Sequence, residues 1–497
     1  MAFDINLLSS SLEDHVPAMR QDFAWVLCRL SHSEGLFTTT DDPQLIPSWT
    51  AFNAIIRQNH VPIQSNIGYL QMIDASPTEL STVYTLMKRS LDLADQLSQE
   101  DAIIVVDQAI YAKVMEIIWK NPQEFNRLIP RLGAFHTCCT FLAVIGKRFA
   151  ESGLNDLLIE SEVCAAGSLR GVMEGRHYNR AVRIHKIVLE ALLRIRLSSF
   201  QTWLQESNMT VDDASLCELI QLIRNDSSEG NLELLLQHPE FIQLHEAYMD
   251  FRNSDQGAMS RYWGSYIDMV ELLLRFIRST REGNWQLHLA CLQGIMPWFF
   301  AYDRTNYARF TPVYWCQMQL LSHTHPEAHQ KLSEGEFAVQ MSNTNGFGQI
   351  PVDQTIEETI NRDSKVKGGI IGFSQKKNTV QRWILTAHER AEFTQLCRRL
   401  AGLTRNSQNK HKQASKSRMK KDENDVQKVQ SILLGWGNPF EPGEDIKHLA
   451  SGVTVSSVVS EDLENAEEKG RELLNKFVTD RLVAENVHYI VPFQSFS

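Results

Sequence analysis

The sequence contains little of what usually reveals a compartment or a class of protein. Its eight cysteines in 497 residues are scattered inside apolar segments without a CxxC pair, which is typical of reduced thiols and not of a disulfide framework. No uncharged apolar run approaches the length of a membrane span, and the N-terminus lacks a basic segment followed by a long apolar one. We therefore expect a protein of the nucleus or cytoplasm that is not secreted and has no membrane partner.

An excess of positive charge is also absent. The 49 Lys and Arg residues stand against 60 Asp and Glu residues, which gives a net charge of -11. Because phosphate binding requires clustered lysine and arginine, this balance opposes nucleic-acid binding over the whole surface, and any such contact must be local. The hydrophobic fraction of 43% is that of an ordinary globular protein, and the length predicts about two to four domains.

Two further motifs are incomplete. The glycine-rich run at residues 368–373 lacks the GK[ST] of a phosphate-binding loop, so it favours a strand between glycine turns. His325 and His329, with His323 nearby, have a spacing that can place two imidazoles on one helical face for zinc. They have neither an HExxH motif nor a clear carboxylate partner, which disfavours a metal site.

The most informative pattern that is present is a short apolar segment ending on a carboxylate. Residues 102–106 read Ala-Ile-Ile-Val-Val, Asp107 follows, and a helical pattern runs from Gln108 to Trp119. A β-branched segment bounded by polar residues predicts a buried strand. Asp107 would then either face the crevice where α/β folds bind ligands or cap the helix that follows.

Changes of pattern divide the chain into six segments. A second short strand near residue 129 and an apolar helix over 137–149 complete the order strand, helix, strand, helix, which is typical of an α/β layer. The predicted segments are an N-terminal segment (1–60), the first part of an α/β core (61–165), a helical insertion (166–340), the second part of the core (341–402), a basic linker (403–428) and a C-terminal helical domain (429–497).

The helical insertion shows clear apolar stripes, one over residues 184–195 and another over 269–276. Opposite the first stripe lies a basic face, which either is solvated or touches the phosphates of a nucleic acid. Its residues are Arg176, Arg180, Arg183 and Lys186, with Arg194 beyond.

The basic linker has seven Lys and Arg residues between Leu403 and Lys421 and no acidic residue. Such a segment is typical of a flexible, solvated connector, and a nuclear-import signal or a nucleic-acid tether stay open as alternatives. We expect limited proteolysis to cut there and release a folded C-terminal fragment. In that fragment, Gly470 lies on an apolar helix face and would permit close packing against a neighbour.

Several longer blocks resemble a family of uncharacterised proteins present in many near-identical copies in invertebrate genomes, especially those of cnidarians. The similarity spans roughly Val61 to the C-terminus, and the copy number implies a mobile-element origin. The blocks are VVDQAIYAKVMEIIW, RLGAFHTCCTFLAVIGKRF, YNRAVRIHK, GNWQLHLACLQGIMPWFFAYDRTNYARF and DQTIEETINRDSKVKGGIIGFS.

A more distant resemblance is to cut-and-paste transposases of the hAT type, which have an RNase H-like core. In that pattern an Asp closes a core strand and a Cys-x-x-His stretch opens a later helix, as Asp107 and His136 do here. The first Cys of the stretch is absent, since Leu132-Gly133-Ala134-Phe135 stands before His136. His136 is therefore either a ligand or a satisfied core histidine.

The resemblance implies a two-metal site for phosphoryl transfer, which requires three or more converging carboxylates. Asp107 is the first candidate metal ligand, and Glu357, 250 residues later on a predicted acidic helix over 353–361, is the second. Asp74, after a strand-like run, is the third candidate catalytic acid. Mg²⁺ is the implied cofactor. The alternative interpretations, without a metal, are that Asp74 is a turn residue and that Glu357 lies on a solvated helix face.

The sequence thus predicts an α-rich α/β fold in which an RNase H-like core is interrupted by a large helical insertion and followed by a small C-terminal helical domain. The expected function is that of a transposon-derived, DNA-associated protein with a degenerate metal-dependent nuclease site. A non-enzymatic intracellular helical scaffold is the alternative, favoured by the negative net charge and by the missing N-terminal zinc finger or helix-turn-helix. Convergence of Asp107 and Glu357 on one layer would favour the first hypothesis, and a solenoid with the two far apart would favour the second.

Overall fold

The segment around Asp107 forms a parallel β-α-β unit. In the computed structural model, which describes residues 8, 15–30, 47–71, 73–207, 214–254, 256–361, 374, 376–401 and 415–483, β1 (Ala102–Val106) pairs in parallel with β2 (Leu128–Leu132). Helix α5 (Gln108–Lys120) connects the two strands. The predicted strand and the helix after it are therefore confirmed. Helix α4 (Leu80–Gln96) packs on β1 and α5 and shares a small apolar core with them.

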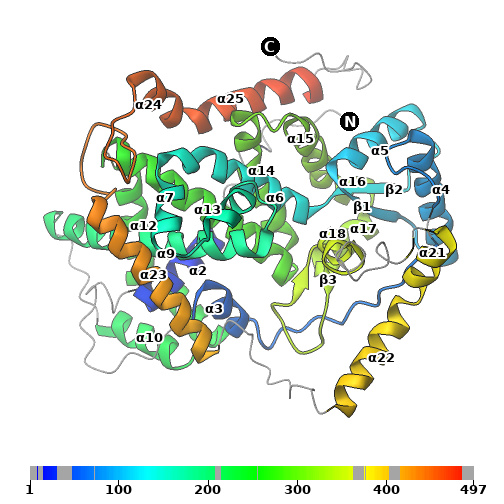
Figure 1. Ribbon diagram of the computed structural model, residues 1–497, viewed down its shortest axis with the longest axis horizontal. Helices are drawn as coiled ribbons and strands as arrows, with labels where there is room; N and C mark the ends of the chain where they lie inside the picture. The colour runs from blue at the N-terminus through cyan, green and yellow to red at the C-terminus, as the bar shows by residue number, and fades with distance from the viewer. Residues whose placement is uncertain are drawn as a thin grey trace.

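A large body of helices adjoins this unit (Figure 1). At its centre, α6, α9, α13 and α14 pack against one another, and both predicted apolar stripes, over 184–195 and 269–276, are buried. These helices carry apolar residues over more than one face, as expected of helices surrounded by others. Their order is α6 (Ala134–Phe149), α7 (Leu154–Glu160), α8 (Ala166–Met173), α9 (Tyr178–Glu206), α10 (Ala214–Asn225), α11 (Glu229–Gln237), α12 (Pro239–Asn253), α13 (Ala258–Glu282), α14 (Trp285–Ala301), α15 (Thr305–Gln319), α16 (Leu321–Thr324) and α17 (Pro326–Lys331).

One continuous apolar core runs through segments that the sequence separates. It includes residues of α2 (Val16–Leu30) and α3 (Trp49–Ile56) from the N-terminal segment, of α6 from the predicted α/β core, and of most of the helical block. It also includes Val429 and Leu433 of α23 (Lys416–Trp436) and Leu474 and Phe477 of α25 (Ala466–Val478). The six predicted segments therefore do not correspond to six separate cores.

The predicted basic linker is helical over its second half. Residues 416–428 belong to α23, which runs along α9, while residues 402–414 lie outside the described part of the chain. The acidic residues Asp422, Glu423 and Asp425 of α23 form ion pairs with arginines of the body, and this pairing explains why a segment that looks solvated in the sequence is docked. The prediction of a flexible connector is therefore wrong for residues 416–428, which form part of a docked helix.

Helices α24 (Ser457–Glu464) and α25 lie across the end of the body, with α25 against α14 (Figure 1). Helix α25 lies close to α14 at Gly470, because a Cβ added there would lie 2.2 Å from the carbonyl oxygen of Pro297. The close packing predicted at Gly470 is confirmed.

We expect Gly470→Ala to lower the free energy of unfolding by about 1 to 3 kcal/mol, because backbone atoms of α14 cannot easily move away from the added methyl group. Gly435→Ala is the matched control, since nothing lies within 4 Å of a Cβ at this exposed helical position and alanine there should stabilise α23 by up to about 1 kcal/mol. Urea denaturation measures both changes. Equal stability of the two variants would contradict the close packing.

After the helical body the chain returns to the β-α-β unit. Strands β3 (Val339–Gln340) and β4 (Gln349–Ile350) form an antiparallel ribbon, and α18 (Val352–Ile356) follows with a π-helical turn, η4 (Glu357–Asn361). The predicted acidic helix over 353–361 is therefore present, with its second half in the π-helical form. The glycine-rich run at 368–373 lies outside the described residues.

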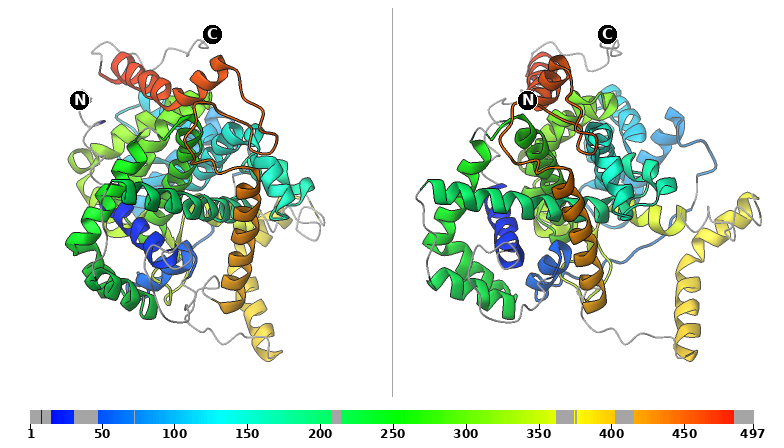
Figure 2. Two further views of the ribbon diagram at one scale, coloured as in Figure 1. Left: turned by 90° about the vertical axis from the view of Figure 1, so that its left-hand side faces the viewer. Right: turned by 60° about the vertical axis from the view of Figure 1, so that its left-hand side comes forward.

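Helices α21 (Lys377–Leu385) and α22 (Ala387–Leu400) extend away from the body (Figures 1 and 2), and none of their side chains for which burial is described is buried. The architecture is α-rich, as predicted. The described residues contain two separate two-stranded sheets, which are too small to establish the predicted RNase H-like core. Among the described helices, none is both long enough and apolar enough to cross a membrane.

Candidate functional site

The parallel pairing of β1 and β2 places two chain segments at one edge of the sheet. Asp107 directly follows β1, and Gly133 follows β2 and leads into α6. Because the carboxyl ends of parallel strands lie at the same edge, Asp107 and the start of α6 are neighbours, as is usual for α/β sites. Helix α18 packs on both α6 and β1 and completes the site.

A carboxylate from α18 caps the N-terminus of α6. The buried Asp353 accepts hydrogen bonds from the backbone N–H groups of Phe135 (3.2 Å) and His136 (3.0 Å). Gly133, the residue at the N-cap position, has no side chain to do this, and a Cβ there would lie 2.2 Å from Asp353 Oδ2. The glycine therefore makes room for a cap that comes from 220 residues further along the chain, and the partial positive charge of the helix terminus favours it.

His136 is held by the same carboxylate. Its Nδ1 lies 2.9 Å from Asp353 Oδ2, and the side chain is one-third exposed. The hydrogen bond with Asp353 raises the pKa of His136 above its ordinary value; burial opposes the shift, and the charges of Asp353, Glu357 and Asp107 add to it. The arrangement orients the imidazole and favours its protonated form, which can act as an acid or hold an anion.

Two cavities meet at His136. The first, of about 810 Å³, is called the carboxylate cavity here because Asp107, Asp353 and Glu357 all contribute to its wall. The structure thus brings together two of the predicted site residues, Asp107 and Glu357, across 250 positions of sequence. A solenoid in which they lie far apart is not what the chain forms.

Asp107 also serves as a helix cap. Its Oδ1 accepts a hydrogen bond of 2.9 Å from the backbone N–H of Ile110 in the first turn of α5. Asp107 therefore both lines the cavity and caps α5, so both interpretations of this residue have a structural basis.

Asp74 does not line the carboxylate cavity. It is exposed and forms an ion pair of 2.7 Å with Lys377.

The predicted metal site is not assembled by the described residues. Within them, no group of three or more His, Cys, Asp or Glu side chains could hold a metal ion. Asp353 is occupied by three hydrogen bonds and Asp107 by the α5 cap, so the donors do not fit a site for Mg²⁺ that needs several free carboxylate oxygens. His325, one of the zinc candidates, is 2.8 Å from Asp101.

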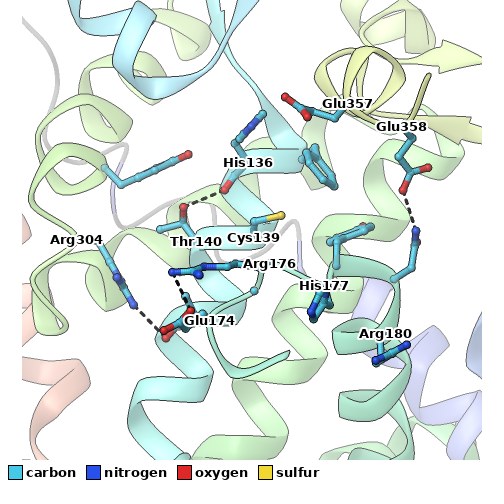
Figure 3. Close-up of a pocket in the computed structure, with 16 residues that line it drawn as sticks. His136, Cys139, Thr140, Glu174, Arg176, His177, Arg180, Arg304, Glu357 and Glu358 are labelled. Atoms are coloured by element: carbon cyan, nitrogen blue, oxygen red, sulfur yellow. Dashed lines mark hydrogen bonds and ion pairs between the residues drawn. The ribbon is translucent and has the colours of Figure 1, made fainter. Parts of the chain in front are cut away.

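The second cavity, of about 780 Å³, lies on the other side of His136 and is called the arginine cavity here (Figure 3). Arg176 and Arg304 lie near each other beside Glu174, Arg180 lies across the cavity beside His177, and Glu357 lies near His136 with Glu358 next to it. Arg180 donates to Ser168 Oγ at 2.6 Å and Arg304 donates to the Ala143 carbonyl at 3.1 Å. These contacts hold guanidinium groups at the cavity wall, where a phosphate or carboxylate could be bound.

The loop that carries Arg176 is fixed against α6 by two glycines. Gly175 has φ +70°, and a Cβ on it would lie 2.1 Å from the carbonyl oxygen of Cys139. A Cβ on Gly146 would lie 2.1 Å from the carbonyl oxygen of Met173.

Cys139 also lines this cavity. Burial raises the pKa of Cys139 to about 12, so this residue stays a thiol and is a poor nucleophile.

Two residues of the predicted basic face do not reach the arginine cavity. Arg183 forms ion pairs with Asp422 (2.7 Å) and Asp425 (2.5 Å) of α23. Lys186 donates to Thr50 Oγ1 at 2.6 Å, and burial lowers its pKa to about 7. Because α23 covers this part of α9, the nucleic-acid contact predicted from four residues is reduced to Arg176 and Arg180.

Sequence reasoning missed two residues of the site. Asp353 was placed on the correct acidic helix, but only the pairing of that helix with α6 gives it a role. Arg304 follows the turn after α14 and has no motif around it. The one available signal was the glycine before the α6 helix, since a helix start without a capping side chain requires a cap from elsewhere.

Comparison with known families shows one match. Residues 48–490 match the model of a domain of unknown function, DUF8702, which covers most of the sequence. The chain belongs to this family. No curated protein matches it, and no solved structure does.

Proposed function

We propose that this member of the DUF8702 family is a transposon-derived, DNA-associated protein whose metal-dependent nuclease centre is degenerate. The observation that carries the proposal is that Asp107 and Glu357, 250 residues apart, line one cavity with His136. Acids at a strand end and on a helix after a long insertion are what the resemblance to hAT-type transposases implies. On this proposal the β-α-β unit is the remnant of an RNase H-like core.

The degenerate character rests on the carboxylates. Phosphoryl transfer by two metal ions requires three or more carboxylates with free oxygens. Here Asp107 caps α5, Asp353 caps α6, and Asp74 pairs with Lys377 and does not line the cavity. Weak binding of Mg²⁺ at most is therefore expected.

The association with DNA rests on the arginine cavity. A chain with a net charge of -11 can bind phosphates only where basic residues cluster. The arginine cavity provides such a cluster, formed by Arg176, Arg180 and Arg304. His136 is positively charged at pH values below its raised pKa. Because His136 lines both cavities, it would lie beside a phosphodiester that spans them.

A binding experiment tests the DNA contact. We expect the double variant Arg176→Ala/Arg180→Ala to bind labelled DNA about tenfold more weakly at low salt, because two phosphate contacts are lost. Lys120→Ala/Lys469→Ala is the matched control, since both lysines are exposed and pair with acidic neighbours away from the cavity. Fluorescence anisotropy gives the Kd values. If the wild-type protein does not bind DNA, the proposal fails and the helical scaffold remains.

Incubation of labelled DNA with Mg²⁺ or Mn²⁺ tests the degenerate centre. We expect the wild-type protein to cleave no faster than Asp107→Asn. Asparagine caps helices about as well as aspartate, so this variant should keep its thermal stability. Metal-dependent cleavage by the wild-type protein that is lost in Asp107→Asn would show a complete nuclease centre.

A further inference from the structure

The arginine cavity continues along one face of α6. A third cavity, of about 720 Å³, shares Ala143, Glu174, Arg176 and Arg304 with it, just as the carboxylate cavity shares His136 and Glu357. The three cavities therefore adjoin one another in a row. The residues of α6 that line the row, together with Ala150 just beyond its end, repeat at helical spacing along one face of the helix. They are Phe135, His136, Cys139, Thr140, Ala143, Gly146, Lys147 and Ala150.

The row has a defined length. From His136 to Ala150 a helix rises about 21 Å, at about 1.5 Å per residue. A single nucleic-acid strand that is stacked as in a duplex advances about 3.4 Å per nucleotide, so about six nucleotides match this distance. We call this row of cavities the α6 groove.

Charge along the α6 groove is arranged unevenly. Its carboxylate end has five acidic residues and one basic residue, whereas the remainder has five basic residues. The acidic ones are Asp92, Asp107, Asp353, Glu357 and Glu358, with Arg89 beside them; the basic ones of the remainder are Lys147, Arg170, Arg176, Arg180 and Arg304. Two acidic residues lie among them. Glu174 pairs with Arg170 and Arg176, both at 2.9 Å, and Glu151 lies at the far end. Beyond the carboxylate end, the lining is therefore basic overall, as a path for phosphates requires.

The walls of the groove favour one strand over two. One wall comes from α8 and the loop into α9, and both helices pack directly on α6. The other wall comes from α15, where Arg304 donates a hydrogen bond to the backbone of α6. The floor is thus the width of a single helix, about 10 Å. A DNA duplex is wider than its own major groove, which is about 12 Å wide, and is therefore too wide for this floor. Phe135 and Tyr307 also line the groove; both residues are half-buried and offer aromatic surface for stacking of bases.

We propose that the α6 groove binds single-stranded nucleic acid, with the strand running from the basic end towards Asp107 and His136. This inference rests on the proposed function and names its ligand: the strand is an unpaired segment of DNA, not an intact duplex. Phosphates contact the arginines and Lys147, and bases stack on the aromatic rings.

Length dependence tests this inference. We measure the Kd of the full-length protein for labelled oligo(dT) of two, four, six, eight and twelve nucleotides and for a twelve-base-pair duplex. Affinity should rise up to about six nucleotides and then level off, and the twelve-nucleotide strand should bind at least about tenfold more tightly than the duplex. Binding of the two-nucleotide strand as tightly as of the longer strands, or a preference for the duplex, would overturn the inference.

Variants at the far end of the groove locate the strand. Lys147→Ala/Arg170→Ala should weaken binding of the twelve-nucleotide strand about tenfold and leave the two-nucleotide strand unchanged, whereas Arg176→Ala/Arg180→Ala should weaken both. The matched control is again Lys120→Ala/Lys469→Ala. If the far-end variant has no effect while Arg176→Ala/Arg180→Ala weakens binding, the α6 groove is not the path but the proposed function survives. No binding of any DNA would remove both.

Discussion

Asp353→Ala is expected to lower the free energy of unfolding by about 3 kcal/mol. The change removes the cap of α6 and leaves the N–H groups of Phe135 and His136 without their acceptor in a part-buried place. Chemical denaturation measures the loss. Asp250→Ala, at an exposed aspartate of α12, is the control and should change stability by less than about 0.5 kcal/mol. A loss as small as that of the control would show that Asp353 is not the cap.

The same substitution should lower the pKa of His136, which NMR titration of the imidazole measures. In the wild-type protein the folded-state pKa lies above the ordinary value of 6.5, mainly because of the hydrogen bond with Asp353. A pKa that is raised on folding gives stability that is fully present below the unfolded-state pKa and is lost as the pH rises through the folded-state pKa. The difference in stability between wild-type protein and Asp353→Ala should therefore shrink as the pH rises above the raised pKa. An unchanged pKa in the variant would contradict the pairing.

Glu190→Ala is expected to have the largest effect, a loss of about 3 to 5 kcal/mol in the free energy of unfolding. Glu190 is buried and accepts from Arg29 of α2 at 2.7 Å and from Arg194 of α9 at 2.8 Å. Glu423 of α23 contacts the same two arginines, so the variant would lose one of the two carboxylates of this cluster. Removing one member of a buried ionic cluster costs this much because a charge stays buried without compensation.

Glu116→Ala is the matched control, since this glutamate pairs with Lys120 on the exposed face of α5 and should contribute less than about 1 kcal/mol. Hydrogen exchange should also show that Glu190→Ala loosens α23, because the cluster joins α23 to α9 and α2. Unchanged exchange in α23 together with a small stability loss would mean that the apolar contacts of Val429 and Leu433 hold the helix by themselves.

The sequence by itself determined what depends on local periodicity. The β-branched segment before Asp107 predicted β1, and the apolar stripes over 184–195 and 269–276 predicted buried helix faces, because side-chain direction repeats with the period of the element. The close approach at Gly470 was also readable, since a glycine on an apolar helix face has few other reasons to be there. Asp107 could be recognised as a candidate because it stands where a strand ends.

Only the tertiary structure decided which faces meet. An apolar stripe indicates that a helix face is buried and does not indicate against which partner, so the chain divided into six segments in the sequence while one core joins them in space. The covering of Arg183 and Lys186 by α23, and the capping of α6 by Asp353, are contacts across about 240 and 220 positions. No local pattern records such a pairing, because the free energy that fixes it comes from burial, charge neutralisation and hydrogen bonds that exist only once the elements have packed.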